Sequence, residues 1–239
     1  MIKVLIWNEY HHERYNGRPQ ELYPNGMHEA IAKGIACDEF EIRTAHLTSD
    51  EFQGLSDEAL SWADVLIYWA HCRHDDVLDE TAQRVARHIR NGLGFIPLHS
   101  AHGSKVFRLL MGTNCNLRWR NMDEREHLWL VNPRHPVAAG VPAEFALASE
   151  EMYGEYFDIP KPDDIVFLGW FKGGNVFRSG IEFTRGYGKI FYFQPGHETC
   201  PTYYNPHVLR VISNAARYCA RTAAVPAFNG EFEYNIEAF

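Results

Sequence analysis

The sequence has no excess of basic residues. Its 239 residues include 23 Lys and Arg against 31 Asp and Glu, and the formal net charge is −8. A surface that binds nucleic acid needs positive charge to neutralise phosphates. We therefore expect no nucleic-acid partner.

Long apolar runs and paired cysteines are also lacking. The apolar run at residues 3–7 is interrupted by Asn8 and Glu9, which makes it too short for a signal peptide or a membrane span. The five cysteines are odd in number, scattered, and never in CxxC spacing. This pattern argues against a disulfide framework or a structural zinc knuckle. We expect a cytoplasmic protein with no membrane partner.

Histidines and aromatic residues are abundant instead. The chain has 13 histidines, and 14% of its residues are Phe, Trp or Tyr. Aromatic rings line sugar and ligand pockets as well as filling cores, and histidine serves as acid, base or metal ligand. Composition alone does not choose between these uses.

The first half of the chain alternates strand and helix patterns. The predicted strands are residues 3–7, 39–47, 64–69 and 94–98. The intervening helices include one with Met27 and Ile31 on one face, one at residues 57–62, one capped by Asp76 that stops at Asn91, and one near residues 105–111. Such alternation predicts right-handed crossovers and an α/β fold, a mostly parallel sheet with helices on both faces.

The pattern changes after about residue 113. Residues 126–131, 144–148, 165–171 and 189–194 resemble strands with little helix between them, which predicts extra antiparallel strands or a flap. Asn205 and Pro206 announce a final helix. We expect one domain over residues 1–222. The partly apolar tail, residues 223–239, should dock on this subunit or on a neighbour in a homo-oligomer.

Polar residues follow four of the predicted strands, where open parallel sheets bind ligands. Any one histidine is more often a helix cap or a partner of a core carbonyl than a ligand-binding group. Four coinciding strand ends favour a shared pocket. The strand-end residues are Asn8, Glu9, His71, His99, Ser100, His102, His197 and Glu198.

Ser100 permits a serine-hydrolase interpretation. His197 would be the base, and Glu151, Glu155 or Glu198 would orient it. A nucleophile elbow needs small residues two positions before and after the nucleophile, but a leucine and a histidine stand there.

A metal interpretation uses His71, His102 and His197 as ligands of a divalent ion such as zinc, with an open position for water or substrate. No HExxH or HxH spacing supports it, so the ligands would have to converge from distant strands.

A third interpretation is acid–base chemistry beside a sugar carbonyl or its hydrated form, with His99, His197, Glu151 and Glu155 as candidate bases. An exposed acidic turn near residues 151–156 is an equally good account of these two glutamates. The candidate substrate-binding residues are Asn8, Glu9, His12, Trp69, Arg118, Tyr153 and Arg178.

Five motifs together resemble the ThuA-like proteins of trehalose utilisation, over about residues 1–220. They are VLIWNE at 4–9, PLHSAH at 97–102, HPV at 135–137, EMYGE at 151–155 and FQPGHE at 193–198. The resemblance implies a fold similar to class I glutamine amidotransferases, with a flavodoxin-like sheet. Members of that fold have a cysteine at the elbow and a downstream His-Pro-Glu. Here Ser100 is taken as the elbow residue and Gly196-His197-Glu198 as the counterpart, so we expect no glutaminase.

The resemblance further implies a role in bacterial sugar catabolism, beside oxidoreductases that produce keto-sugars. We expect a carbohydrate-modifying isomerase, lyase or hydrolase that acts on a disaccharide or its 3-keto derivative by acid–base or metal-assisted chemistry. The alternative is a non-catalytic sugar-binding or sensing domain with the same pocket.

Overall fold

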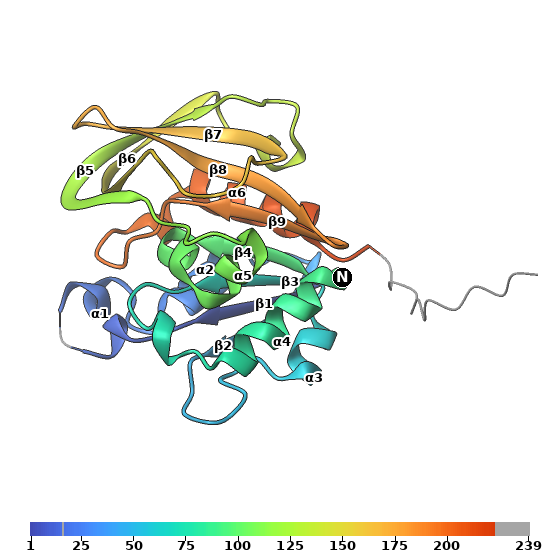
Figure 1. The fold of residues 1–239 in the computed structure, drawn as a ribbon. Helices are drawn as coiled ribbons and strands as arrows, with labels where there is room; N and C mark the ends of the chain where they lie inside the picture. Colours follow the sequence, from blue (N-terminus) through green and yellow to red (C-terminus); the bar gives the residue numbers. More distant parts are fainter. Residues whose placement is uncertain (16, 223–239) are drawn as a thin grey trace, which may run out of the picture.

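A nine-stranded sheet runs through the structure, a computed structural model that describes residues 1–15 and 17–222 (Figure 1). The strand order is β2-β1-β3-β4-β9-β8-β7-β5-β6. The strands are β1 (Ile2–Asn8), β2 (Phe40–His46), β3 (Val65–Trp69), β4 (Gly94–Leu98), β5 (Arg118–Leu130), β6 (Glu144–Gly154), β7 (Asp164–Phe171), β8 (Val176–Arg185) and β9 (Gly188–Phe193).

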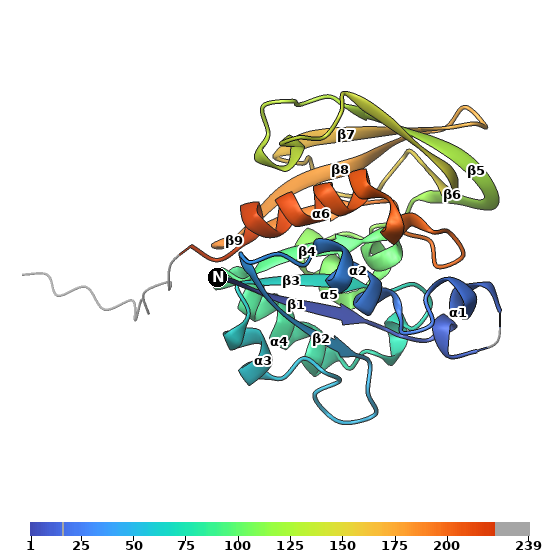
Figure 2. The same cartoon turned by 180° about the vertical axis from the view of Figure 1, so that it is seen from behind.

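Helices cover both faces of the parallel half, as the alternating pattern predicts (Figures 1 and 2). α2 (Met27–Ile35) and α6 (Pro206–Cys219) pack into one apolar core, and α3 (Asp57–Trp62), α4 (Asp79–Arg90) and α5 (Lys105–Met111) pack into the other. β3 and β4 are buried at every residue, as expected for central strands covered on both faces. A short helix, α1 (Arg18–Leu22), lies in the long loop after β1.

The strand register brings four loop starts to one rim. Asn8 of β1 is opposite Trp69 of β3, which is opposite Leu98 of β4, which is opposite Phe193 of β9. Because these strands are parallel, the residues that follow them leave the sheet at the same edge. The predicted convergence of strand ends follows from this register.

β9 joins the parallel and antiparallel halves, since it pairs parallel with β4 and antiparallel with β8. β8 is not predicted from the sequence, because Ser179 and Gly180 interrupt its apolar pattern. The predicted strand 144–148 continues as β6 to Gly154, and Glu150 and Glu151 are buried in it. The account of the 151–156 segment as an exposed acidic turn is therefore wrong for its first four residues, although Tyr156 is exposed.

Two helix starts differ in how well they were predicted. Asn205 caps α6 as predicted, since its Oδ1 accepts from the backbone N–H of His207 and Val208. Asp76 does not cap α4: it ends a short 3₁₀ turn, and Leu78 occupies the N-cap position. The predicted docking of the tail lies outside the described residues, and within them no helix is long and apolar enough to cross a membrane.

Candidate functional site

A cavity of about 460 Å³ opens at the rim where β3, β4 and β9 end. The side chains that line it come from the loops after these strands, from α5, from the start of β5 and from the far end of β6. The lining residues are His71, His74, Ser100, His102, Gly103, Arg108, Trp119, Asn121, Glu151, Tyr153, His197 and Glu198.

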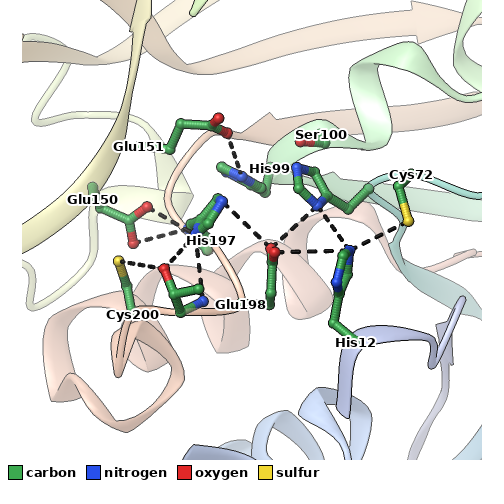
Figure 3. Close-up of polar contacts among 12 residues, drawn as sticks. His12, Cys72, His99, Ser100, Glu150, Glu151, His197, Glu198 and Cys200 are labelled. Carbon is green, nitrogen blue, oxygen red and sulfur yellow. Dashed lines mark hydrogen bonds and ion pairs between the residues drawn. The ribbon is translucent and has the colours of Figure 1, made fainter. Parts of the chain in front are cut away.

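Three imidazoles and one carboxylate converge beside this cavity. His71, His99, His197 and Glu151 each offer one nitrogen or oxygen atom, and these four atoms lie within 4.8 Å of one another. His99 Nε2 is 3.2 Å from Glu151 Oε2. Figure 3 shows His99, Glu151 and His197 facing one another. The two halves of the sheet thus both contribute, since Glu151 comes from β6.

His99 is held in an uncommon backbone conformation directly after β4. Its φ is 51°, in the left-handed region that non-glycine residues rarely adopt and that clusters at functional sites. Its Nδ1 is 3.0 Å from the carbonyl of Gln194, its own carbonyl accepts from Tyr192 Oη, and its ring stacks on that of Tyr153. The ring is fully buried.

His99, and not Ser100, therefore occupies the sharp turn after β4. The Ser100 hydroxyl lies 2.5 Å from Tyr153 Oη. Among the described residues no imidazole hydrogen-bonds to it, so the predicted base His197 does not activate Ser100. The elbow assignment was wrong by one residue, because the strand ends at Leu98 and the next residue takes the left-handed turn.

A second set of contacts centres on Glu198. Its Oε2 is 3.2 Å from His71 Nδ1 and 3.6 Å from His197 Nε2, and its Oε1 is 3.7 Å from His12 Nε2. His12 Nε2 also lies 3.3 Å from Cys72 Sγ. Glu198 Oε2 has no hydrogen bond of good geometry among the described residues, although it is buried.

Burial and charge move the pKa values of these groups apart. Burial raises the pKa of Glu198, but contact with His71 and the nearby imidazoles outweigh it and lower the pKa to about 2. For His71, burial lowers the pKa, but Glu198 outweighs it and leaves the pKa raised. Burial, with nearby His99, lowers the pKa of His197 to about 4. Burial raises the pKa of Glu151, but the hydrogen bond with His99 outweighs it and the pKa is lowered.

Two buried carboxylates position the loops that carry the histidines. Glu9 accepts the backbone N–H groups of His71, Cys72 and Arg73 at 2.7 to 3.0 Å. Glu150, which was not predicted, does the same for the loop after β9.

Glu150 accepts the N–H groups of Gly196 and His197 at 3.2 Å and the hydroxyl of Thr202. Trp69 Nε1 donates to the carbonyl of Gly196 at 2.9 Å. Glu9 and Trp69 thus hold backbone groups of the loops that carry the site, and neither of them lines the cavity.

His102 lines the cavity but is not one of the three imidazoles that converge with Glu151. Its Nδ1 lies 2.9 Å from the carbonyl of Cys115, and burial lowers its pKa to about 3. The structure groups His71 and His197 with His99 and Glu151, and His102, the third histidine of the metal set expected from the sequence, is not part of this group.

Several predicted site residues lie elsewhere. Glu155 forms an ion pair with Arg178 at 2.8 Å, and neither lines the cavity. Arg118 is exposed at the start of β5. Asn8 is buried, with its Nδ2 donating to Glu13 Oε1 at 2.7 Å. Of the predicted substrate-binding residues, Tyr153 lines the cavity and His12 touches it through Glu198.

Solved structures share this fold at low sequence identity. A putative ThuA-like protein from Parabacteroides merdae has a TM-score of 0.66 and 16% identity, over 94% of this chain and 93% of its own. A protein from Salmonella typhimurium described as cytoplasmic has a TM-score of 0.59 and 14% identity, over 92% and 100%. A glutamine amidotransferase from Thermotoga maritima has a TM-score of 0.54 and 11% identity, over 91% and 97%.

These structures confirm the predicted fold, an α/β fold of the class I glutamine amidotransferase type, in which antiparallel strands extend a parallel sheet. No curated protein matches the chain by sequence. The model of one family, ThuA, described as trehalose utilisation, matches residues 3–219. The chain belongs to the ThuA family.

Proposed function

We propose that this chain is an enzyme of sugar catabolism that acts on a disaccharide or its 3-keto derivative in the cavity at the sheet rim. The observation that carries the proposal is the convergence of His71, His99, His197 and Glu151 beside that cavity, which three of them, His71, His197 and Glu151, also line. Proton donors and acceptors this close together suit acid–base chemistry. The family description, trehalose utilisation, supports a disaccharide as the substrate class.

A 3-keto-disaccharide offers a reaction that needs a base and an acid close together. The ketone at carbon 3 acidifies the proton on carbon 2, so a base can remove it. The electron pair then forms the double bond between carbons 1 and 2, and the bond from carbon 1 to the glycosidic oxygen breaks. That oxygen takes a proton from an acid, which releases the second sugar, and water added across the double bond completes a net hydrolysis.

Side chains of the site match the needs of this reaction. Glu151 and His197 line the cavity and are candidates for the base, and His71, which also lines it, is a candidate acid. Tyr153 and Trp119 both line the cavity, and Trp119 is 67% exposed. Aromatic faces of this kind pack against the apolar faces of sugar rings.

The test is incubation of the purified chain with 3-keto-trehalose, with and without a chelator, followed by NMR of the products. We expect consumption of the substrate by the native protein. His197→Gln should lower turnover by at least about 100-fold, as for loss of an acid or base. His99→Gln, made separately, should do the same, because His99 Nε2 lies 3.2 Å from Oε2 of Glu151, a candidate base, and positions it. His88→Gln is the matched control, because His88 lies on α4 and pairs with Asp57 away from the cavity.

Unchanged substrate in every condition would contradict the proposal. A sugar-binding or sensing domain, the alternative, would bind the sugar without turnover, and the two substitutions would then alter affinity only modestly.

A further inference from the structure

We infer that His71, His99, His197 and Glu151 bind one divalent metal ion of the zinc type. Three imidazole nitrogens and one carboxylate oxygen form a ligand set that zinc accepts, and an ion so held can still expand its coordination to take a substrate oxygen. Binding of the ion rests on the geometry alone. A role of the ion in catalysis rests on the proposed function. With the ion bound, the lone pairs of His71, His197 and Glu151 are taken up by it, so Glu198, which also lines the cavity, would then be the candidate base.

The four ligand atoms are already gathered. All lie within 4.8 Å of one another, and His99 Nε2 and Glu151 Oε2 are 3.2 Å apart. With zinc–ligand bonds of about 2.0 Å, the ligands of one tetrahedral ion lie about 3.3 Å apart. The pair of His99 and Glu151 has that spacing, and the remaining separations can close by small rotations of the side chains of His71 and His197.

The far nitrogen of each ring has a partner of its own. His99 Nδ1 is 3.0 Å from the carbonyl of Gln194, which accepts its proton. His197 Nδ1 is 2.7 Å from Thr199 Oγ1. In metalloproteins, such partners on one nitrogen fix the tautomer and leave the lone pair of the other nitrogen for the metal.

His71 completes this pattern through a carboxylate. Its Nδ1 lies 3.2 Å from Glu198 Oε2. A metal ion on the other ring nitrogen would complete the series of carboxylate, histidine and metal that is common in metalloproteins. That Glu198 oxygen is buried without a hydrogen bond of good geometry among the described residues. A divalent charge beside His71 would stabilise this carboxylate.

Burial favours tight binding at this position. His99, His197 and Glu151 are between 0% and 4% exposed, so an ion bound here would be shielded from water on most sides. The cavity reaches the cluster from the remaining side, since His71, Glu151 and His197 also line it. An ion in this place can polarise a sugar carbonyl and stabilise the negative charge that forms on its oxygen when the neighbouring proton leaves.

The experiment strips the full chain of metal with a chelator, then titrates it with Zn²⁺ by calorimetry and with Co²⁺ by visible absorption. We expect one ion per chain and the intense bands of tetrahedral Co²⁺. His99→Gln and Glu151→Gln should each weaken Zn²⁺ binding by about 100-fold or more, since even the partners of ligands are worth about 10- to 100-fold.

His102→Gln is the matched control. This imidazole lines the same cavity, but its Nδ1 lies against the backbone carbonyl of Cys115 and it is not one of the four proposed ligands. Its replacement should therefore leave Zn²⁺ affinity within a few-fold of the native value. Circular dichroism establishes that each variant is folded before titration. The inference would be overturned if the folded native protein bound no ion, or if His99→Gln and Glu151→Gln bound Zn²⁺ as tightly as the native chain.

The two proposals fail separately. If the metal-free chain turned over 3-keto-trehalose at the full rate, the metal would have no role in the reaction, and the proposed enzymatic function would still stand. One tightly bound ion in a chain that leaves every tested sugar unchanged would support the metal site and count against the proposed function.

Discussion

Glu150 and Glu151 are neighbours in the sequence, yet they serve different parts of the site. Successive residues of a strand point to opposite sides, so in β6 Glu151 reaches the histidine cluster while Glu150 turns to the loop after β9. The sequence singled out Glu151 and missed Glu150. The period of two along β6 could have found it, had the strand been predicted to run beyond residue 148.

A third buried glutamate, Glu126 on β5, gives a prediction at the residue scale. It is fully buried, one of its oxygens has no hydrogen bond among the described residues, and the other accepts from Ser179 Oγ at 3.1 Å. Burial, with the nearby charge of Glu150, raises its pKa well above the ordinary range. The folded state therefore holds a proton on Glu126 at pH values where the unfolded chain has lost it.

Stability must then fall as the pH rises above the unfolded pKa of about 4.3, by up to about 1.4 kcal/mol per pH unit, until the raised folded pKa is passed. Glu126→Gln removes this loss, so the free energy of unfolding of the variant should rise relative to the native value between pH 5 and pH 8. Urea unfolding at several pH values measures the difference. Glu58→Gln, at an exposed position of α3, should show no such trend, and a flat difference for Glu126→Gln would contradict the prediction.

At the scale of residues, the ends of the strands could be predicted from the sequence, but the directions of the side chains could not. The sequence placed His71, His99 and His197 at one rim, because parallel strands end at the same edge. It did not separate His102 from them, since that depends on the contact of its ring with the carbonyl of Cys115. It also did not predict that Glu155 forms an ion pair with Arg178.

At the scale of elements, the loop after β3 is held in place by one carboxylate. Glu9 accepts three successive backbone N–H groups from that loop, which carries His71. Glu9→Gln replaces an acceptor oxygen by an N–H group that faces other N–H groups, and each buried donor left without a partner costs about 1–3 kcal/mol.

We expect Glu9→Gln to lower the free energy of unfolding by about that amount and to speed hydrogen exchange in the 71–73 loop. Glu41→Gln on β2, where the side chain is 41% exposed, is the control and should change neither. Unaltered exchange in the loop of the Glu9 variant would mean that other contacts fix its position.

Two glycines test how α6 packs against its neighbours. A methyl group at Gly94 of β4 would lie 2.2 Å from the backbone carbonyl oxygen of Cys219, whereas at Gly34 of α2 it would meet only the flexible end of Leu209. Gly94→Ala should therefore destabilise by about 1–3 kcal/mol, because α6 has to shift. Gly34→Ala should be close to neutral, since the gain of up to about 1 kcal/mol in helix propensity offsets the displacement of Leu209. Thermal unfolding of the two variants side by side measures this, and equal losses would show that the backbone contact is not limiting.

The elements themselves were predicted unevenly, and the reason is physical. The buried runs of β1, β3 and β4 and the periodic faces of α2 and α6 are long and regular, so their patterns were sufficient. β8 contains a glycine and several polar residues, and a strand of that kind is recognised only by the partners that it pairs with. The start of α4 was set by a 3₁₀ turn that an apolar period does not reveal.

For the whole molecule, the sheet and the two cores join the parallel and antiparallel halves. One core contains Val85 of α4 together with Phe177 of β8, and the other contains Ile6 of β1 together with Val166 of β7. β9 hydrogen-bonds to both halves. The change from parallel to antiparallel pairing is therefore no boundary between independently stable parts.

We accordingly expect residues 1–222 to unfold as one cooperative unit. In hydrogen-exchange mass spectrometry across a urea series, peptides from β1 and from β7 should lose protection at the same urea concentration. Phe177→Leu, a substitution in the antiparallel half at a side chain that is 0% exposed, should lower the midpoint of both peptides equally, by the equivalent of about 1–3 kcal/mol. If the β1 peptide kept its midpoint while the β7 peptide shifted, the halves would be separate folding units, and a site that draws its histidines from one and Glu151 from the other would depend on how they dock.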